Sequence, residues 1–281
     1  PVERSKNVRT SRIATLVVSL ATLIAAFIFL YPIFWMVLGS FKSNSEIFNT
    51  RVYWPMEWTG QYFGILFSGE YLNFERTLFN SIAISISQGV GATILAAMAG
   101  YIIGMYQFRG RMTLVTLGFM VVLIPAQMVA LPLFVWVNAL GLFDNPLGVA
   151  LPGMVSGLGL LFFARVFRLV PKELIEVARM EGASEWRTFL SVLPLVKPFL
   201  IAFGFVHFVL AWHAHVIPML ILHSEEARTL PISLAALYGS SLNSPQAVLM
   251  AGSTIGMIPL ITLFAMAYPQ LKSALQEFVA S

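Results

Sequence analysis

Residues 171–198 read Pro171-Lys-Glu-Leu-Ile-Glu-Val-Ala-Arg-Met-Glu-Gly-Ala-Ser-Glu-Trp-Arg-Thr-Phe-Leu-Ser-Val-Leu-Pro-Leu-Val-Lys-Pro198. This stretch is charged and favours helix, in a chain that is otherwise very apolar. Pro171 suits the first position of a helix, and Gly182 suits the turn that ends it. A second short helix is predicted from Ser184 towards Pro194, with apolar residues at i, i+3, i+4 and i+7. Such an amphipathic helix–Gly–helix unit needs a partner outside the bilayer, and we expect that partner to be another subunit.

The composition indicates a membrane protein. The chain is 58% hydrophobic and 11% charged, and its mean hydropathy is +0.82, whereas a soluble domain is usually about a quarter charged. The sequence predicts an all-α, polytopic membrane protein in which residues 1–281 form a single transmembrane domain. Apolar runs long enough to cross a bilayer predict six spans, at about 13–38, 80–106, 113–137, 147–167, 198–222 and 248–271. The first run is too long for a signal peptide, so we interpret it as a retained span.

The basic residues predict the orientation of the chain in the membrane. Only Lys42, Arg51, Arg76 and Arg228 lie on one side of the predicted spans. The other basic residues lie on the opposite side: Arg4, Lys6, Arg9, Arg12, Arg109, Arg111, Arg165, Arg168, Lys172, Arg179, Arg187, Lys197 and Lys272. The positive-inside rule therefore places both termini and the loop 168–197 in the cytosol.

The predicted orientation determines which residues are accessible from each side of the membrane. A cysteine at Ser184 should react from the cytosol, and one at Ser244 from outside. The net charge of +4 requires no nucleic-acid partner to explain it.

The stretch 171–198 resembles the loop that defines permease subunits of binding-protein-dependent ABC importers. That loop reads roughly E-A-A, three residues, G-A, then a downstream L-P. The matching residues here are Glu176-Val177-Ala178, Gly182-Ala183, Phe189 and Leu193-Pro194. Val177 replaces a small residue, and Glu181 stands where the family usually has Asp. The rest of the chain resembles the carbohydrate, maltose-type branch of the family through Ser40-Phe41-Lys42, Asn80-Ser81, Ala99-Gly100-Tyr101 and Phe108-Arg109-Gly110-Arg111.

The resemblance implies a multi-pass permease subunit of a carbohydrate (oligosaccharide) importer in the bacterial inner membrane, surrounded by lipid. Its implied partners are a second permease in a heterodimer, two ATPase subunits and an external solute-binding protein. ATP and Mg would bind the ATPase subunits, and this chain would bind no cofactor. The residues implied in ATPase docking and coupling are Glu176, Ala178, Glu181, Gly182, Ala183, Trp186, Phe189, Leu193 and Pro194, with Glu176 as an ion-pair partner.

Motifs for catalysis are missing from the sequence. The chain has no phosphate-binding Gly-x-x-x-x-Gly-Lys-Ser/Thr, no His-Glu-x-x-His, no Gly-x-Ser-x-Gly and no cysteine, so we expect neither ATP binding nor catalytic residues. Two other classes remain open. One is a proton-coupled secondary transporter, which would carry an inverted repeat and membrane carboxylates. The other is a membrane-embedded signalling or enzyme subunit. The charged loop resembles neither.

All four histidines fall in or just beyond the fifth predicted span. At about 100° per residue they do not share one helix face, so we expect no metal site. They either hydrogen-bond to neighbouring helices or line the solute path. The path candidates are His207, Trp212, His213 and His215. Imidazoles along the path would suit a carboxylate and would favour an acidic, alginate-like oligosaccharide.

The sequence also predicts a site of close helix packing, several kinks and the extent of the outer loops. Gly100 and Gly104, extended back to Ala96, form a small-xxx-small face that lets helices approach closely. Prolines that can kink a span are Pro125, Pro132, Pro152, Pro218 and Pro259. The outer segments are 43–79, ordered by its aromatic residues, 138–146, and 223–247 with a short helix around 230–242. We expect them to receive the solute-binding protein.

Overall fold

The computed structural model describes residues 2–49, 51–239 and 246–280, and these residues contain helices and turns but no strand. The predicted all-α class is confirmed. Within the described residues, five helical segments are long and apolar enough to cross a membrane, and a bent helix pair makes a sixth candidate span. The chain divides into two compact units, Pro1–Tyr71 with Ser240–Ile255, and Leu72–Gly239 with Gly256–Ser281.

The first unit holds one membrane-spanning helix and an ordered loop. Helix α1 covers Val2–Gly39, and its apolar part, Ala14–Gly39, matches the first predicted span. Helices α2 (Asn44–Phe48) and α3 (Gln61–Phe67) follow. Neither helix is predicted from the sequence, and the predicted loop, 43–79, ends too late because α4 begins at Phe74. The loop ends at Asn73, because the Asn73 side chain accepts a hydrogen bond from the Arg76 backbone N–H and so caps the next helix.

Lys42 holds the loop of the first unit together. Its side chain is fully buried, and its ammonium donates hydrogen bonds to the carbonyls of Val52 (2.8 Å) and Tyr53 (3.0 Å). The ammonium also lies 4.3 Å from the ring centre of Trp35. Burial lowers the pKa of Lys42, and the charge of nearby Glu46 opposes this shift. The aromatic pairs of this loop, including Trp54–Trp58, give it the order that its composition predicts.

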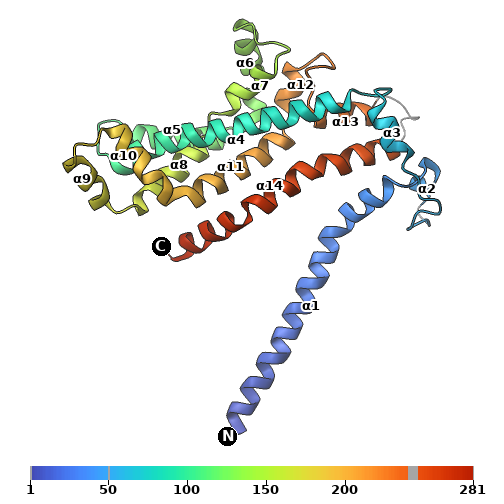
Figure 1. Cartoon of the computed structure of the whole chain (residues 1–281), viewed down its shortest axis with the longest axis horizontal. Coiled ribbons are helices and arrows are strands. Elements are labelled where there is room, and N and C mark those ends of the chain that lie inside the picture. The colour runs from blue at the N-terminus through green and yellow to red at the C-terminus, as the bar shows by residue number, and fades with distance from the viewer. Residues whose placement is uncertain (1, 50, 240–245, 281) are drawn as a thin grey trace. The chain divides into compact units, whose positions relative to one another are not determined.

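The second unit is built around α4 (Phe74–Met105). It continues with α5 (Arg111–Leu123), α6 (Ala126–Ala139), α7 (Pro146–Gly153), α8 (Gly157–Val166), the short turn η1 (Phe167–Leu169), α9 (Lys172–Met180), α10 (Glu185–Val192), the turn η2 (Leu193–Val196), α11 (Lys197–His213), α12 (Val216–Ile221) and α13 (Leu230–Gly239). Helix α14 (Gln246–Ala280) belongs to this unit from Gly256 onward. Figure 1 shows α4 running beside α8 and α11, and α4 makes its most extensive contacts with these two helices.

The predicted small-residue face of α4 is confirmed. A Cβ atom on Gly100 would lie 2.4 Å from the Phe163 Cβ and 2.8 Å from the Ala164 backbone nitrogen. A Cβ atom on Gly104 would lie 3.1 Å from the Ala164 carbonyl oxygen. At Gly100, helices α4 and α8 therefore approach at a distance that only glycine permits, and at Gly104 the approach is less close.

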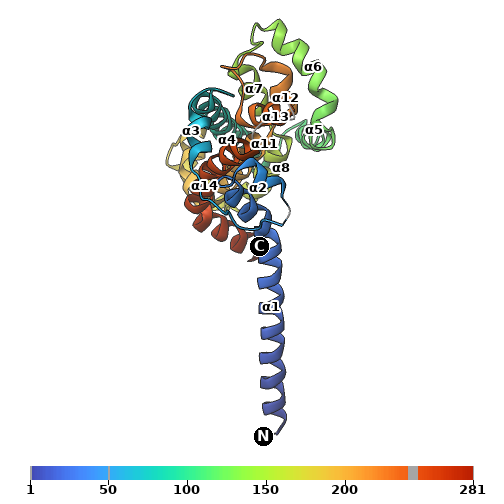
Figure 2. The ribbon, with the colours of Figure 1, turned by 90° about the vertical axis from the view of Figure 1, so that its right-hand side faces the viewer.

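Three predicted spans are not continuous helices. The third, 113–137, is two helices, α5 and α6, bent by 103° (Figure 2). Ile124, which precedes Pro125, has an extended backbone, as the proline ring requires. The fifth, 198–222, ends at His213 because Pro218 cannot continue a helix through the carbonyl of Ala214. The fourth is interrupted between Gly153 and Gly157, where Ser156 caps α8.

Side-chain hydrogen bonds tie together the end of the second unit at which α4 begins. Asp144 accepts hydrogen bonds from the backbone N–H groups of His223 (2.8 Å) and Ser224 (2.9 Å). Asn80 donates to the Glu226 carbonyl, and Ser81 accepts from the Leu230 backbone N–H. The helix predicted around 230–242 is α13. Residues 240–245, including Ser244, lie outside the described residues.

Candidate functional site

Gly182 makes the turn between the two loop helices. Its φ is +79°, a conformation that is inexpensive only for glycine. The Gly182 N–H donates to the Arg179 carbonyl (2.9 Å), and the Ala183 N–H donates to the Ala178 carbonyl (3.0 Å). This paired arrangement is the Schellman motif, which satisfies the last carbonyls of α9. The predicted helix–Gly–helix unit is therefore present.

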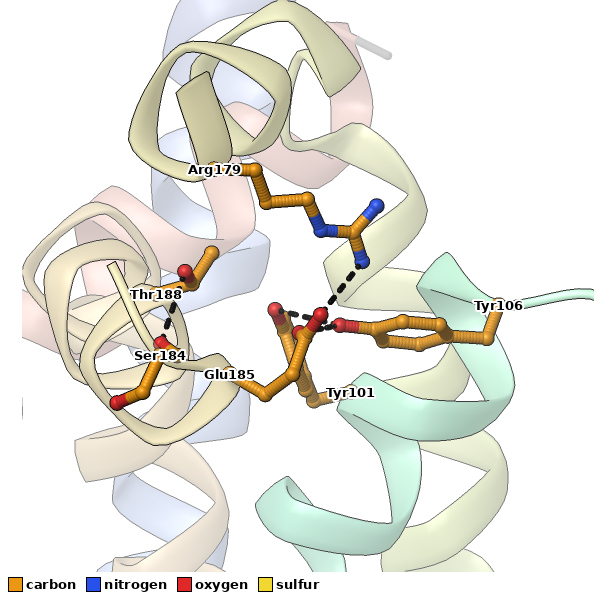
Figure 3. A network of polar contacts seen from close by, with 6 residues as sticks. All are labelled: Tyr101, Tyr106, Arg179, Ser184, Glu185 and Thr188. Carbon is orange, nitrogen blue, oxygen red and sulfur yellow. Dashed lines mark hydrogen bonds and ion pairs between the residues drawn. The ribbon is translucent and has the colours of Figure 1, made fainter. Parts of the chain in front are cut away.

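Helix α10 leads directly into the membrane-spanning part of the chain. Ser184 caps it by accepting a hydrogen bond from the Arg187 N–H, and the buried Thr188 hydroxyl donates to the Ser184 carbonyl (Figure 3). The turn η2 then joins α10 to α11 without an extended residue, and Glu185–His213 reads as one long apolar element. The second half of the predicted loop 168–197 is thus the start of a long helical segment.

A set of buried side chains anchors the loop to the membrane helices. Phe189 of α10 is 6% exposed, and its ring centre lies 5.1 Å from that of Tyr101 on α4 and 6.2 Å from that of Phe167. Ile175, Val192 and Val196 belong to the same buried cluster, and Leu193 packs against it. Two of the predicted docking residues, Phe189 and Leu193, therefore face the interior of this chain.

The other predicted docking residues lie at or near the surface. Glu176, Glu181, Gly182, Trp186 and Pro194 are exposed, and Ala178 and Ala183 are half-buried. We define the outward face of the loop by its exposed large apolar side chains: Leu174, Val177, Met180, Trp186 and Leu190. A group of exposed large apolar side chains on two short consecutive helices is a candidate interaction surface.

A polar network joins both loop helices to the end of α4 (Figure 3). The Glu185 carboxylate accepts a hydrogen bond from the Tyr106 hydroxyl and forms a 3.2 Å ion pair with Arg179. The Tyr101 and Tyr106 hydroxyls lie 3.3 Å apart, and the Arg179 guanidinium lies 5.1 Å from the Tyr106 ring centre. Hydrogen bonding with Tyr106, and then with Glu185, raises the pKa of Arg179 above its ordinary value, so the arginine stays charged.

This network is not among the features predicted from the sequence, in which Arg179 contributes only a positive charge to the loop. The available signal was the pair of opposite charges on either side of Gly182, together with two tyrosines five residues apart at the end of the second span.

His207 contacts a neighbouring helix. Its Nε2 lies 2.9 Å from the Gly153 carbonyl at the end of α7, and a carbonyl only accepts, so Nε2 is the donor. The break after Gly153 leaves carbonyls without helical partners. Gln88 also contacts this helix, because its amide donates to the Val149 carbonyl within α7 (2.9 Å). These contacts favour the packing interpretation of His207.

The remaining path candidates have separate surroundings. Trp212 is buried and stacks on Phe208. His213 and His215 are exposed, and their ring nitrogens lie 2.8 Å from the Val209 carbonyl and 3.4 Å from the His213 carbonyl. Trp212, His213 and His215 lie together at or just beyond the end of α11, and His207 contacts α7 instead.

A cleft of about 530 Å³ lies near the helix breaks of the second unit. Its lining includes Gln88, Trp136, Gly153, Ala214 and Pro218, and it contains none of the four path candidates. Gln88 was missed by the sequence analysis, although a lone amide within a predicted span is a usable signal.

Comparison with known proteins gives consistent relatives. Residues 96–276 match the family model described as binding-protein-dependent transport system inner membrane component. The arabinooligosaccharides transport system permease protein AraQ of Bacillus subtilis (strain 168) is 31% identical over 244 residues, which are 84% of this chain and 85% of that protein. The trehalose transport system permease protein SugB of Mycobacterium tuberculosis (strain CDC 1551 / Oshkosh) is 30% identical over 255 residues, 89% of this chain and 92% of that protein.

A solved structure shares the fold. It is a chain of a bacterial ABC transporter involved in the import of the acidic polysaccharide alginate, with a TM-score of 0.80 and 22% sequence identity. The match covers 94% of this chain and 98% of that chain. At this identity the likeness concerns the fold.

Proposed function

The chain belongs to the family of inner membrane components of binding-protein-dependent transport systems, and from that premise we propose that it forms half of the translocation path of an ABC importer for an oligosaccharide. It is a multi-pass inner-membrane protein. The observation that carries the choice of solute is that the relatives with 30–31% identity are named for saccharide transport. Proteins that align with 84% and 89% of this chain are named for the transport of arabinooligosaccharides and trehalose.

The proposed complex contains four further chains. These are a second permease that forms a heterodimer with this one, two ATPase subunits that bind ATP and Mg, and an external solute-binding protein. The outward face of the loop supports ATPase docking, because it presents five large apolar side chains on two short helices. The distribution of basic residues supports cytoplasmic termini and a cytoplasmic loop.

The anchoring of the loop suggests how ATP hydrolysis acts on the path. Helix α10 continues into α11, and Phe189 packs against α4. A displacement of α9 and α10 by the ATPase subunits would therefore move two membrane helices with them. Rigid-body motion of packed helices is an established way to switch a protein between two states, here between inward and outward access.

The function is tested by reconstituting the complex with its partner permease, ATPases and binding protein in liposomes. We expect arabinooligosaccharides or trehalose to stimulate both ATP hydrolysis and solute uptake, and an acidic oligosaccharide is included as the competing class. If no saccharide stimulates an otherwise active ATPase, the proposed solute class is wrong.

A further inference from the structure

The network of Tyr106, Arg179 and Glu185 lies where three helices meet. Arg179 is in the last turn of α9, Glu185 is the first residue of α10, and Tyr106 directly follows α4. The 3.2 Å ion pair spans the Gly182 turn and so joins the ends of the two loop helices. The hydrogen bond from the Tyr106 hydroxyl then joins that pair to α4 (Figure 3).

We propose that Tyr106 is a positioning residue for energy coupling, which fixes the orientation of α9 and α10 relative to α4 through its hydrogen bond to the Glu185 carboxylate. This inference rests on the proposed function and adds to it a residue outside the loop. Movement of the loop would be transmitted to the end of α4 through the hydrogen bond between Tyr106 and Glu185. The buried contact of Phe189, further along α10, would transmit it as well.

The exposure of the network indicates that it orients the loop helices rather than attaching them to the membrane helices. The side chains of Arg179 and Glu185 are 43% and 62% exposed, and exposed ion pairs contribute little to stability. The buried cluster around Phe189 is what attaches the loop. Apolar contacts are non-directional, whereas a hydrogen bond to a carboxylate requires a defined geometry. Loss of the network should therefore leave the loop attached but less well oriented.

The Tyr106 ring makes contacts that do not involve its hydroxyl, so the role of the hydroxyl can be tested separately from the packing of the ring. It packs edge-on against Tyr101, with ring centres 5.7 Å apart, and it lies under the Arg179 guanidinium. A Tyr106→Phe substitution keeps these ring contacts and removes only the hydroxyl. The Tyr101 hydroxyl, 3.3 Å from that of Tyr106, would lose its neighbour but keep its ring packing against Phe189.

The experiment uses the full reconstituted complex and compares Tyr106→Phe with Tyr268→Phe. Tyr268 is exposed on α14 and packs only its ring against Phe264 in the contacts that the described residues show, so it controls for loss of a hydroxyl. The readouts are the amount of saccharide taken up per ATP hydrolysed, the amount of ATPase subunit that co-purifies, and the melting temperature.

We expect Tyr106→Phe to lower the uptake per ATP by about fivefold or more, the lower end of typical coupling effects, with assembly and melting temperature unchanged. Tyr268→Phe should behave as wild type. Unchanged uptake per ATP in Tyr106→Phe would overturn the inference, and so would parallel losses of stability, assembly and both activities, which would indicate a merely structural role. If the wild-type complex itself shows no saccharide-stimulated hydrolysis, the proposed function fails instead.

Discussion

The ring of Phe189 on α10 lies 5.1 Å from the ring of Tyr101 on α4, with its side chain 6% exposed. This contact ties the loop to the membrane helices, because Phe189 comes from the loop and Tyr101 from the last turns of a spanning helix. The stretch 171–198 therefore has two sides, one that packs into its own chain and one that is free to meet a partner.

Phe189→Ala should destabilise the protein by about 3–5 kcal/mol, the usual cost of removing a buried phenylalanine. Leu190→Ala is the matched control, because Leu190 is the next residue of the same helix and is 45% exposed. Thermal unfolding of the purified complex measures the difference. We expect Leu190→Ala to reduce co-purification of the ATPase with little change in melting temperature, and equal melting temperatures for the two variants would contradict the assignment of the two sides.

Gly100→Ala should lower the melting temperature because the added methyl group meets backbone atoms of α8 at 2.7 and 2.8 Å. Alanine gains up to about 1 kcal/mol in helix propensity over glycine, but overpacking costs about 1–3 kcal/mol. At Gly104 the nearest atoms are at 3.0 and 3.1 Å, so Gly104→Ala should be closer to neutral. A stabilising effect at Gly100 would show that α4 and α8 are not packed this closely.

His207→Ala should reduce stability and leave the solute preference unchanged. It removes the donor to the part-buried Gly153 carbonyl, so the loss should be at or below the roughly 1–3 kcal/mol that an unpaired buried carbonyl costs. His213→Ala removes an exposed ring whose contact lies within its own helix, so it should be nearly neutral. Melting temperatures are compared with uptake of a neutral and an acidic oligosaccharide. A selective loss of acidic-sugar uptake at normal stability would restore the path interpretation of His207.

Asp144 should make the stability of the complex depend on acidic pH. The Ser224 N–H, opposed by burial and aided by the His223 N–H, holds the pKa of Asp144 below its ordinary value of 3.8. Because the folded pKa is depressed, the stabilisation is fully present above the ordinary pKa and is lost as pH falls through the folded pKa. Asn tolerates the φ of 56° at this position, so Asp144→Asn tests the charge alone.

The measurement for Asp144 is the melting temperature as a function of pH from neutral down into the acidic range. We expect the wild type to lose stability more steeply than Asp144→Asn as the carboxylate protonates, and the two to converge at the lowest pH. Parallel curves for wild type and Asp144→Asn would show that the carboxylate contributes nothing through its charge.

The sequence predicts the local features of this protein well. Gly182 needs a left-handed backbone to end α9, and the small residues of α4 permit close packing, so both roles follow from residue type and spacing. The length of the apolar runs likewise predicts the membrane helices, since a bilayer of fixed thickness sets that length.

Features that depend on contacts between distant segments could not be predicted. A bend of 103° at Pro125 depends on what surrounds the proline, because proline permits but does not fix a bend. In the sequence, Phe189 is one of several apolar residues on α10, and its role as an anchor is seen only in its contact with Tyr101. The pairing of His207 with Gly153 and of Tyr106 with Glu185 joins residues 54 and 79 positions apart, and the local sequence does not show which distant residue each side chain will meet.

The most direct test of coupling through the loop is Gly182→Val in the reconstituted complex. A Cβ atom at Gly182 would meet nothing of this chain within 4 Å, so within the chain the substitution acts chiefly through the backbone, where a left-handed conformation costs a non-glycine residue about 1–2 kcal/mol. Gly182→Asn is the matched control, because asparagine tolerates this conformation.

The quantity to measure is saccharide uptake per ATP hydrolysed, with membrane insertion checked in parallel. We expect Gly182→Val to insert normally but to lose coupled uptake or ATPase assembly, and Gly182→Asn to retain most of both. Normal coupled uptake by Gly182→Val would contradict the assignment of this loop as the element that transmits ATP hydrolysis to the translocation path.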